Sequence, residues 1–281
     1  MSAVIAESIV DQRAEVRAVL NYTRNNGVRP VNYTFDPPAG VPRNSGEVDS
    51  RTVTIHNARG FQGLTLDVSG FETIWHRSTL DDWESFQNSE RVKTIDYPEV
   101  EAALKSHTGA DKVVIFDHTL RDSTVEQGGA ALREPVRRVH DDQTFESAPR
   151  RVAKHLPPDE AAWRLERRFA IVNFWRPVGG PVLRTPLAIC DARSIESPDL
   201  IPSDLVYRDW VGETYAIAFN PRHRWYWYPQ QTPTEATLLK VYDSAQDGRA
   251  RMTAHTAFDD PTSAPDAPPR RSIEIRSILF W

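Results

Sequence analysis

The sequence predicts a mainly β fold with flanking helices, of the double-stranded β-helix (jelly-roll) type. The C-terminal half holds several short runs rich in aromatic and β-branched residues, bounded by proline, glycine and asparagine. Glycine is scarce, at 13 residues, and proline is plentiful, at 21. No Gly-x-Gly loop occurs, which weighs against a dinucleotide or S-adenosylmethionine domain built from βαβ units. Short strands between punctuated loops favour the jelly roll.

The first 110 residues are expected to add helices and strands to this core. Apolar residues at helical spacing predict a helix within 6–20, and "YPEVEAALKSH" predicts a second helix. "VNYTF" and "TVTIHN" alternate as strands do. We therefore interpret 1–281 as a single domain, with 1–110 an N-terminal elaboration and 111–281 the β-helix core.

The core is expected to begin with a buried strand, "DKVVIF", at 111–116. "REPVRRVHDDQ" then predicts a strand that runs into a candidate site, and 157–168 predicts a helix with prolines and acids at its start. The remaining strand-like runs are "FAIVNFW", "ETYAIAFN", "HRWYWYP", "ATLLKVYD" and "RSIEIRSILFW".

Composition excludes several classes of protein. A formal charge of −5 gives no electrostatic reason to expect nucleic acid as a partner. No apolar run reaches the roughly 20 residues of a membrane span, and the first residues carry acids where a secretory signal has an apolar core. The single Cys190 excludes an intrachain disulfide framework. We expect a cytoplasmic protein with a small-molecule substrate, and a homodimer is the assembly we consider.

The stretch "RVHDDQT" carries the first metal-binding pattern. On an extended segment, residues two apart project from one face, so His140 and Asp142 can point at one spot while Asp141 points away. An imidazole and a carboxylate that converge make two thirds of a facial metal site. An ordinary surface pair at a strand end is the alternative.

His255, in "MTAHTAFDDP", is the best third ligand among the other histidines. Two imidazoles and one carboxylate hold Fe(II) on one face and leave three positions open. Those positions suffice for the 2-oxo acid end of 2-oxoglutarate and for O2, the two cosubstrates that this pattern suggests. A histidine with a purely structural role is the alternative for this residue.

The last strand offers an anchor for the far carboxylate of 2-oxoglutarate. Arg270 can bind it through two parallel hydrogen bonds, and Ser272, on the same face, can add a hydroxyl donor. Arg271 and Arg276 are rivals, because a slip of one residue exchanges the two faces of a strand.

Other residues are candidates for contact with substrate. They are Asn173, Trp175 and Arg176 in "NFWRP", Tyr226 in the aromatic run "RWYWYP", and Arg121 in "FDHTLRDS". Each has a plain structural alternative in the barrel core. Asp117 and His118 are adjacent and point to opposite faces of a strand, so we expect a structural ion pair among Asp117, His118 and Arg121 rather than joint chelation.

These motifs also resemble a known family. "FDHTLR", "VHDDQT", "NFWRP", "HRWYWYP", "LLKVYDS", "HTAFDDP" and "PRRSIEIRS" are similar to those of the CmcJ/AsaB-like hydroxylase/desaturase proteins, a branch near the Fe(II)/2-oxoglutarate-dependent dioxygenases of secondary metabolism. The resemblance implies His140, Asp142 and His255 as iron ligands and Arg270 as the cosubstrate residue. It also implies hydroxylation, desaturation or oxidative cyclisation of a small secondary-metabolite intermediate, for which an amino-acid derivative is one candidate.

Two other functions stay open at this point. A non-redox jelly-roll metalloprotein would need the three metal ligands but not Arg270. A methyltransferase-type tailoring protein would bind S-adenosylmethionine and would not depend on iron, although the sequence contains no nucleoside-binding loop to support it.

Overall fold

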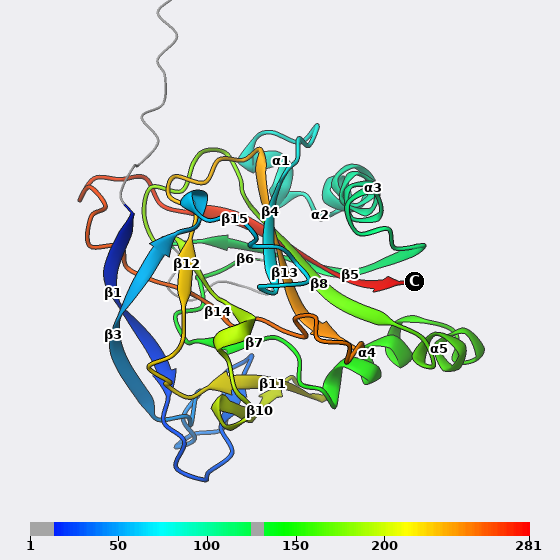
Figure 1. Cartoon of the computed structure of the whole chain (residues 1–281), viewed down its shortest axis with the longest axis horizontal. Coiled ribbons are helices and arrows are strands. Elements are labelled where there is room, and N and C mark those ends of the chain that lie inside the picture. Colours follow the sequence, from blue (N-terminus) through cyan, green and yellow to red (C-terminus); the bar gives the residue numbers. More distant parts are fainter. Residues whose placement is uncertain (1–13, 125–131) are drawn as a thin grey trace, which may run out of the picture.

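The computed structural model describes residues 14–124 and 132–281, in which two β-sheets form the body of the molecule and the helices lie at its periphery (Figure 1). The mainly β class with flanking helices is as predicted. Two stretches lie outside the described residues: "QGG" at 127–129, which the sequence predicts to be a turn, and residues 1–13 of the N-terminal segment.

The larger sheet has nine strands in the order β1-β3-β12-β9-β14-β7-β11-β10-β2. Its strands are β1 (Glu15–Thr23), β2 (Val31–Tyr33), β3 (Val48–Asn57), β7 (His140–Asp141), β9 (Leu187–Cys190), β10 (Leu200–Val206), β11 (Val211–Ile217), β12 (Trp225–Trp227) and β14 (His255–Ala257). A bridge between Asn21 and Arg138 brings β1 back to the segment that leads into β7. The sheet is therefore curled.

The smaller sheet has six strands in the order β4-β13-β8-β15-β5-β6. Its strands are β4 (Phe71–Trp75), β5 (Lys112–Asp122), β6 (Leu132–Arg133), β8 (Phe169–Pro177), β13 (Glu235–Asp243) and β15 (Arg271–Phe280). The strand expectations for all five aromatic-rich runs are confirmed. Strands from the first 110 residues pair within both sheets, and the division at residue 110 stays a prediction.

The helices are α1 (Trp83–Gln87), α2 (Ser89–Arg91), α3 (Tyr97–Thr108), α4 (Ser147–His155) and α5 (Pro158–Leu165), with a π-helical turn η2 (Val92–Asp96) and short 3-10 turns at Ala58–Gly60, Ala192–Ser194 and Ser197–Asp199. The two helices expected at 97–107 and 157–168 are confirmed as α3 and α5. Pro158 stands in the first turn of α5, where its missing N–H costs no hydrogen bond.

The N-terminal helix expected within 6–20 is wrong over the residues that are described. Glu15–Thr23 forms strand β1, and its side chains alternate between exposed and buried along most of its length. Val16, Ala18, Leu20 and Tyr22 thereby enter one apolar cluster. A period of two buries all four of these side chains, whereas a helix would bury only part of the set.

Strand β8 shows how the smaller sheet divides its residues between two faces. Val172 and Phe174 pack with α1 and α3 on the outer face. On the inner face, Ile171 and Trp175 belong to two different apolar clusters, and Asn173 stands between them. The space between the two sheets therefore has a buried polar layer with an apolar cluster on either side.

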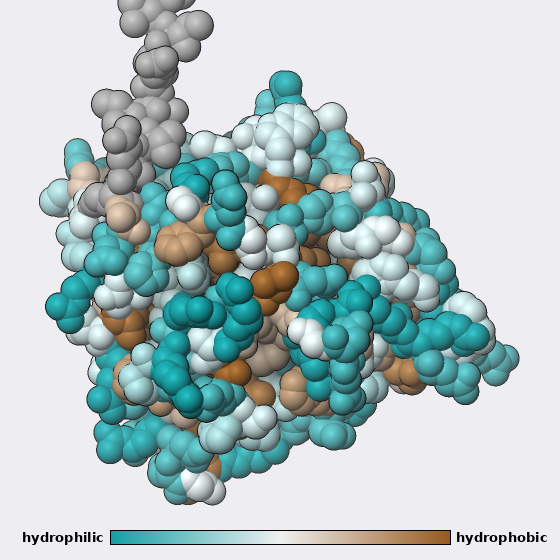
Figure 2. Space-filling view, in the orientation of Figure 1, coloured by the Kyte–Doolittle hydropathy of each residue, from teal (hydrophilic) through white to brown (hydrophobic). Residues whose placement is uncertain are grey.

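The surface gives little further information about partners. In the described residues, no helix is long and apolar enough to cross a membrane. The face shown in Figure 2 is largely hydrophilic, with small, scattered apolar patches.

The outer face of β8 also carries a buried ion pair, which provides a test of the fold. Arg176 Nη2 lies 2.5 Å from Asp96 Oδ1, and both side chains are almost fully buried. We predict that Asp96→Ala lowers the free energy of unfolding by about 3–5 kcal/mol, because it leaves the guanidinium buried without its partner. Urea denaturation measures this change.

Glu101→Ala is the matched control, because Glu101 pairs with Lys105 on the exposed side of the neighbouring helix α3. It should cost less than about 0.5 kcal/mol. Equal effects of the two substitutions would contradict a stabilising role for the buried pair.

Candidate metal centre

His140, Asp142 and His255 come together on the inner face of the larger sheet. Strands β7 and β14 are neighbours, and His140 lies directly opposite His255. The two ring centroids are 4.4 Å apart. One potential ligand atom from each of the three residues lies within 4.8 Å of the others, which is close enough for a single metal ion to be bound by all three. The predicted triad is thus assembled.

The backbone orients His140. Its Nδ1 is 2.7 Å from the carbonyl oxygen of Arg138, and the contact requires the proton to be on Nδ1. Nε2 then carries the free lone pair, and this atom lies 3.6 Å from Asp142 Oδ1. Metal-binding histidines are commonly held in this way, with one nitrogen donating to the protein and the other facing the metal.

The carboxylate of Asp142 is held from the side away from the histidines. Asn173 Nδ2 donates to Oδ2 of Asp142 at 2.7 Å and to Glu274 Oε1 at 3.2 Å. Arg276 Nη1 lies 3.9 Å from the same Oδ2. Burial alone would raise the pKa of Asp142, but His255, Arg276 and His140 together hold that pKa below its ordinary value. The group is therefore a carboxylate, with Oδ1 facing the histidines.

His255 is kept neutral. Burial, and then the neighbouring His140, lower its pKa to about 3, against the opposing influence of Asp142. An imidazole binds a metal ion through the lone pair of its neutral form, so this environment suits a ligand at neutral pH.

Asp141 points away from the triad, as the alternation predicts. It is fully buried, and neither carboxylate oxygen has a hydrogen-bond partner among the described residues. Burial, and then Asp142, raise its pKa well above the ordinary value. Asp141 is therefore a matched neighbour that does not belong to the metal group.

Arg270 lies just before β15, almost fully buried, with its guanidinium 5.6 Å from the ring centre of Trp175. Nη1 donates to the carbonyl oxygen of Thr185 at 2.9 Å. Nε of Arg270 and Oγ of Ser272 are buried and have no partner among the described residues. Donors left without partners in this way fit a ligand that accepts hydrogen bonds.

The two rival arginines are paired with acids. Arg271 Nε lies 3.1 Å from Asp122 Oδ2 on the opposite face of the sheet. Arg276 Nε donates to Asp117 at 2.6 Å, and its Nη2 donates to Thr119 at 2.7 Å. Of the three, only Arg270 has no carboxylate within ion-pair distance among the described residues.

Of the residues expected to contact substrate, some lie near the metal group and Arg270, and others lie elsewhere in the core. Asn173 reaches the metal group, and Trp175 lies beneath Arg270. Tyr226 packs against Phe71, Phe61 and His56 in an aromatic cluster. Arg176 lies on the outer face of β8 with Asp96 and does not join the others. Arg121 lies opposite Ser272, on the face of the smaller sheet that carries Arg270.

Asp117 and His118 do point to opposite faces, but their partners differ from those expected. Asp117 pairs with Arg276 in place of Arg121. His118 Nδ1 is 2.7 Å from the hydroxyl of Tyr97 in α3. Asp117 therefore belongs to the polar layer between the sheets, and His118 belongs to the outer face that α3 covers.

Two residues of the inner layer were not expected in the positions they have: Glu274 was not named, and Arg276 was considered only as an alternative to Arg270. The sequence did contain an indication of them. They follow Arg270 and Ser272 at steps of two, so the face that carries the cosubstrate anchor also carries them.

A second group of potential ligands is less suited to a cation. His76, Asp96 and Glu99 also offer atoms within 4.8 Å of one another. However, Asp96 is paired with Arg176, and both oxygens of Glu99 accept hydrogen bonds from Ser78 or Thr79. A metal ion would have to displace these donors beside a guanidinium.

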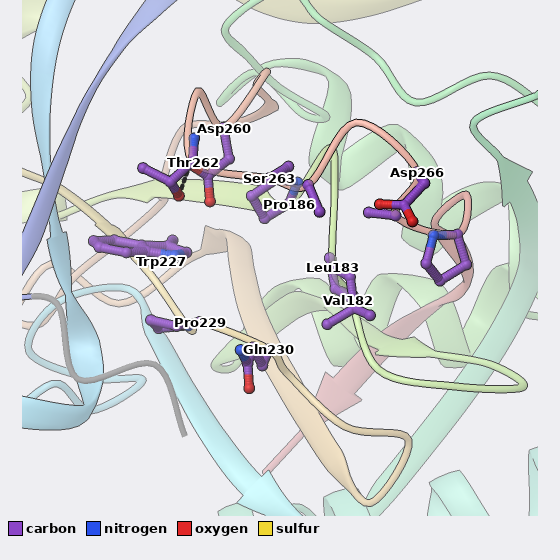
Figure 3. A pocket seen from close by; sticks show the side chains of 13 residues that line it. Val182, Leu183, Pro186, Trp227, Pro229, Gln230, Asp260, Thr262, Ser263 and Asp266 are labelled. Carbon is purple, nitrogen blue, oxygen red and sulfur yellow. Dashed lines mark hydrogen bonds between the residues drawn. The ribbon is translucent and has the colours of Figure 1, made fainter. Parts of the chain in front are cut away.

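A cavity of about 420 Å³ opens between the segments that carry Val182, Pro229 and Asp266 (Figure 3). Its lining residues include Val182, Trp227, Gln230, Asp260 and Asp266. None of the three metal-group residues lines it, nor do the expected substrate residues.

Comparison with known proteins agrees with this geometry. Residues 20–280 match a family model described as an oxidoreductase/YMDC permease-like domain. The hydroxylase/desaturase CTB9 of Cercospora beticola is 34% identical, with 89% of this chain and 85% of CTB9 aligned. The chain belongs to the hydroxylase/desaturase family.

A second relative is similar to this chain in both sequence and structure. The Fe(II)/2-oxoglutarate-dependent dioxygenase nvfI of Aspergillus novofumigatus is 33% identical over 88% of this chain and 90% of its own. A solved structure of the iron and alpha-ketoglutarate-dependent endoperoxidase NvfI superposes with a TM-score of 0.84 and 28% identity, covering 95% of this chain and 98% of that one. The family and the jelly-roll fold predicted from the sequence are both confirmed.

Asp141 and Asp142 offer a matched pair of substitutions to test the metal group. We predict that Asp142→Asn weakens metal binding by about 100-fold or more, because loss of a supporting residue alone costs about 10- to 100-fold. Asp141→Asn should leave the affinity within a few-fold of the wild type. Calorimetric titration of the metal-free protein with Mn(II) gives both affinities, and similar losses in the two variants would contradict the assignment.

Proposed function

We propose that this protein is a non-haem Fe(II)/2-oxoglutarate-dependent oxygenase that hydroxylates, desaturates or oxidatively cyclises a small secondary-metabolite intermediate. One observation carries the proposal. A three-ligand group, with its ligand atoms within 4.8 Å of one another, faces the same buried layer as Arg270, a cation that has no carboxylate partner among the described residues. A protein that only bound a metal would have no use for that cation.

The residues fit the metal and the cosubstrate. Two neutral imidazoles and one carboxylate are the donor set of a facial Fe(II) site. The unpartnered donors Arg270 Nε and Ser272 Oγ fit a carboxylate ligand. When bound, iron and 2-oxoglutarate supply an oxidant from O2, and the chemistry of bond cleavage is theirs.

The chain contributes positions and charges. The hydrogen bond from His140 to the backbone fixes which nitrogen faces the metal. Asn173 holds one oxygen of Asp142 and leaves the other free. The apolar clusters on either side of the polar layer limit the entry of water, which strengthens each of these interactions.

Several features of the reaction are proposed from the relatives. CTB9 is named a hydroxylase/desaturase, and NvfI is named an endoperoxidase. The family thus directs one kind of oxidant to several outcomes. For the present chain we propose a small, amino-acid-derived or related intermediate as the substrate, with Trp175 on the wall of its binding site.

Cellular location and assembly are also proposals. Cys190 is the only cysteine and is fully buried, which supports a protein of the reducing cytoplasm. The homodimer considered from the sequence stays a proposal to be tested by light scattering.

The role of Arg270 gives the most specific test, because Arg271 is adjacent and points to the opposite face. With Mn(II) in place of iron, we predict that Arg270→Gln weakens 2-oxoglutarate binding roughly 10- to 100-fold, the loss expected for a charge-assisted hydrogen bond. Arg271→Gln should bind like the wild type. Calorimetric titration measures both.

A wild-type protein that binds Mn(II) but not 2-oxoglutarate would favour the non-redox metalloprotein. Binding of S-adenosylmethionine without a metal would favour methyl transfer. Equal losses of 2-oxoglutarate affinity in Arg270→Gln and Arg271→Gln would contradict the assignment of Arg270 as the cosubstrate anchor.

A further inference from the structure

The inner layer of the smaller sheet contains more positive charge than the metal and one anchor require. Strand β15 and the residue before it place Arg270, Ser272, Glu274 and Arg276 on one face at steps of two. On the neighbouring strand β5, Arg121 lies opposite Ser272. Three arginines therefore surround one buried layer.

Only one of the three is paired with acids. Arg276 binds Asp117 directly, and its Nη1 lies 3.5 Å from Glu274. Among the described residues, no carboxylate lies within 4.0 Å of the guanidinium of Arg121 or of Arg270. The hydrogen bonds of these two are to backbone carbonyl oxygens, from Arg121 Nη1 to Glu134 at 2.8 Å and from Arg270 Nη1 to Thr185 at 2.9 Å.

Arg121 and Arg270 lie at the same end of this face, because Arg121 is opposite Ser272 and Arg270 is two residues before Ser272. Burial, and then the charge of Arg121, lower the pKa of Arg270 to about 9. The pKa of Arg121 is also lowered, chiefly by burial. Two neighbouring cations without a counter-ion among the described residues destabilise the empty site, and an anion bound between them would relieve both.

Arg121 lies nearer to the metal group than Arg270 does along the face of β15. Arg276 Nη1 lies 3.9 Å from Asp142 Oδ2, and Arg121 stands opposite Ser272, which lies between Arg276 and Arg270 on that face. Arg270 stands over Trp175, beside the loop that carries Thr185. A ligand that reaches from the metal towards Arg270 passes Arg121 first.

The charge of 2-oxoglutarate matches this arrangement. The molecule carries a carboxylate at each end, one of them next to the 2-oxo group that faces the metal. With a divalent metal and this dianion in place, the formal charges of the metal, the cosubstrate, Asp142, Glu274, Arg121 and Arg270 cancel. A ligand with one carboxylate would leave an uncompensated positive charge in the layer.

We propose that Arg121 is a second cosubstrate-binding residue, which binds the carboxylate next to the 2-oxo group while Arg270 binds the carboxylate at the far end. The proposal rests on the proposed use of 2-oxoglutarate and adds a role for the metal-proximal cation. Arg121 thereby helps to select a 2-oxo acid and to orient it at the metal, whereas Arg270 selects for the second carboxylate.

Two 2-oxo acids distinguish the proposed roles of Arg121 and Arg270. Titrations use the Mn(II) protein without O2, with 2-oxoglutarate and with 2-oxobutyrate, which keeps the 2-oxo acid end and lacks the far carboxylate. Arg121→Gln is expected to weaken the binding of both acids, each roughly tenfold or more. Arg270→Gln is expected to weaken the binding of 2-oxoglutarate and to leave the affinity for 2-oxobutyrate near that of the wild type.

Arg133→Gln is the matched control. Arg133 pairs in register with Arg121 on the adjacent strand β6, so this variant removes one nearby positive charge without touching the proposed contact. It should bind both acids like the wild type. Arg121→Lys keeps the positive charge and serves where Arg121→Gln does not fold. It should lose affinity for both acids by a smaller factor, and full affinity in Arg121→Lys would overturn the proposal.

The outcomes are distinct. Wild-type affinity for both acids in a folded Arg121→Gln protein would overturn the proposal and leave Arg121 as a support for the Glu134 backbone. Loss of 2-oxoglutarate binding alone would also overturn it, because Arg121 would then share the far carboxylate. Failure of the wild-type Mn(II) protein to bind 2-oxoglutarate would instead remove the proposed function itself.

Discussion

The buried carboxylate of Asp142 is the constraint on which the rest of the site depends. A carboxylate withdrawn from water is stable only when its charge is balanced and its oxygens are bonded. Asn173 and Arg276 engage one oxygen from the smaller sheet, and the histidines of the larger sheet face the other. The metal group therefore requires both sheets, and the distance between them is set by the apolar clusters on either side.

The same layer explains why this fold suits a dianionic cosubstrate. Its arginines come from steps of two on β15 and from the paired strand β5, so the register of a single pair of strands sets their spacing. Arg276 balances acids of the chain itself, whereas Arg270 and Arg121 lack such partners among the described residues. A rigid sheet thus holds two cations in place before the ligand arrives, which lowers the cost of ordering them on binding.

Local spacing in the sequence was enough to predict the pair His140 and Asp142 and the opposite direction of Asp141, because a strand has a fixed period of two. The third ligand, His255, was chosen among the remaining histidines and was supported by the family resemblance. The same rule, applied to "NFWRP", separates Asn173 from Arg176, yet both were expected at the pocket. Only the structure shows Asp96 beneath the outer face of β8, where it pairs with Arg176. Asp96 and Arg176 are far apart in the sequence, and no local pattern joins them.

The N-terminal strand was missed for a related reason. Residues 15–23 contain apolar side chains at both helical and alternating spacings, and their partner in pairing is β3, which lies beyond the next strand in the chain. Long-range pairing decided between the two patterns. The candidate site could be predicted further than the fold around it, because His140 with Asp142, and Arg270 with Ser272, each lie two residues apart in the sequence.

The most direct test of the central claim is the visible spectrum of the metal-free protein after addition of Fe(II) and then 2-oxoglutarate without O2. We expect a weak metal-to-ligand charge-transfer band in the wild type and its absence in His140→Ala. Such a band requires the 2-oxo acid to bind the iron at the triad. Iron binding with no new band, and no detectable binding of 2-oxoglutarate, would contradict the dioxygenase account and leave a non-redox metalloprotein.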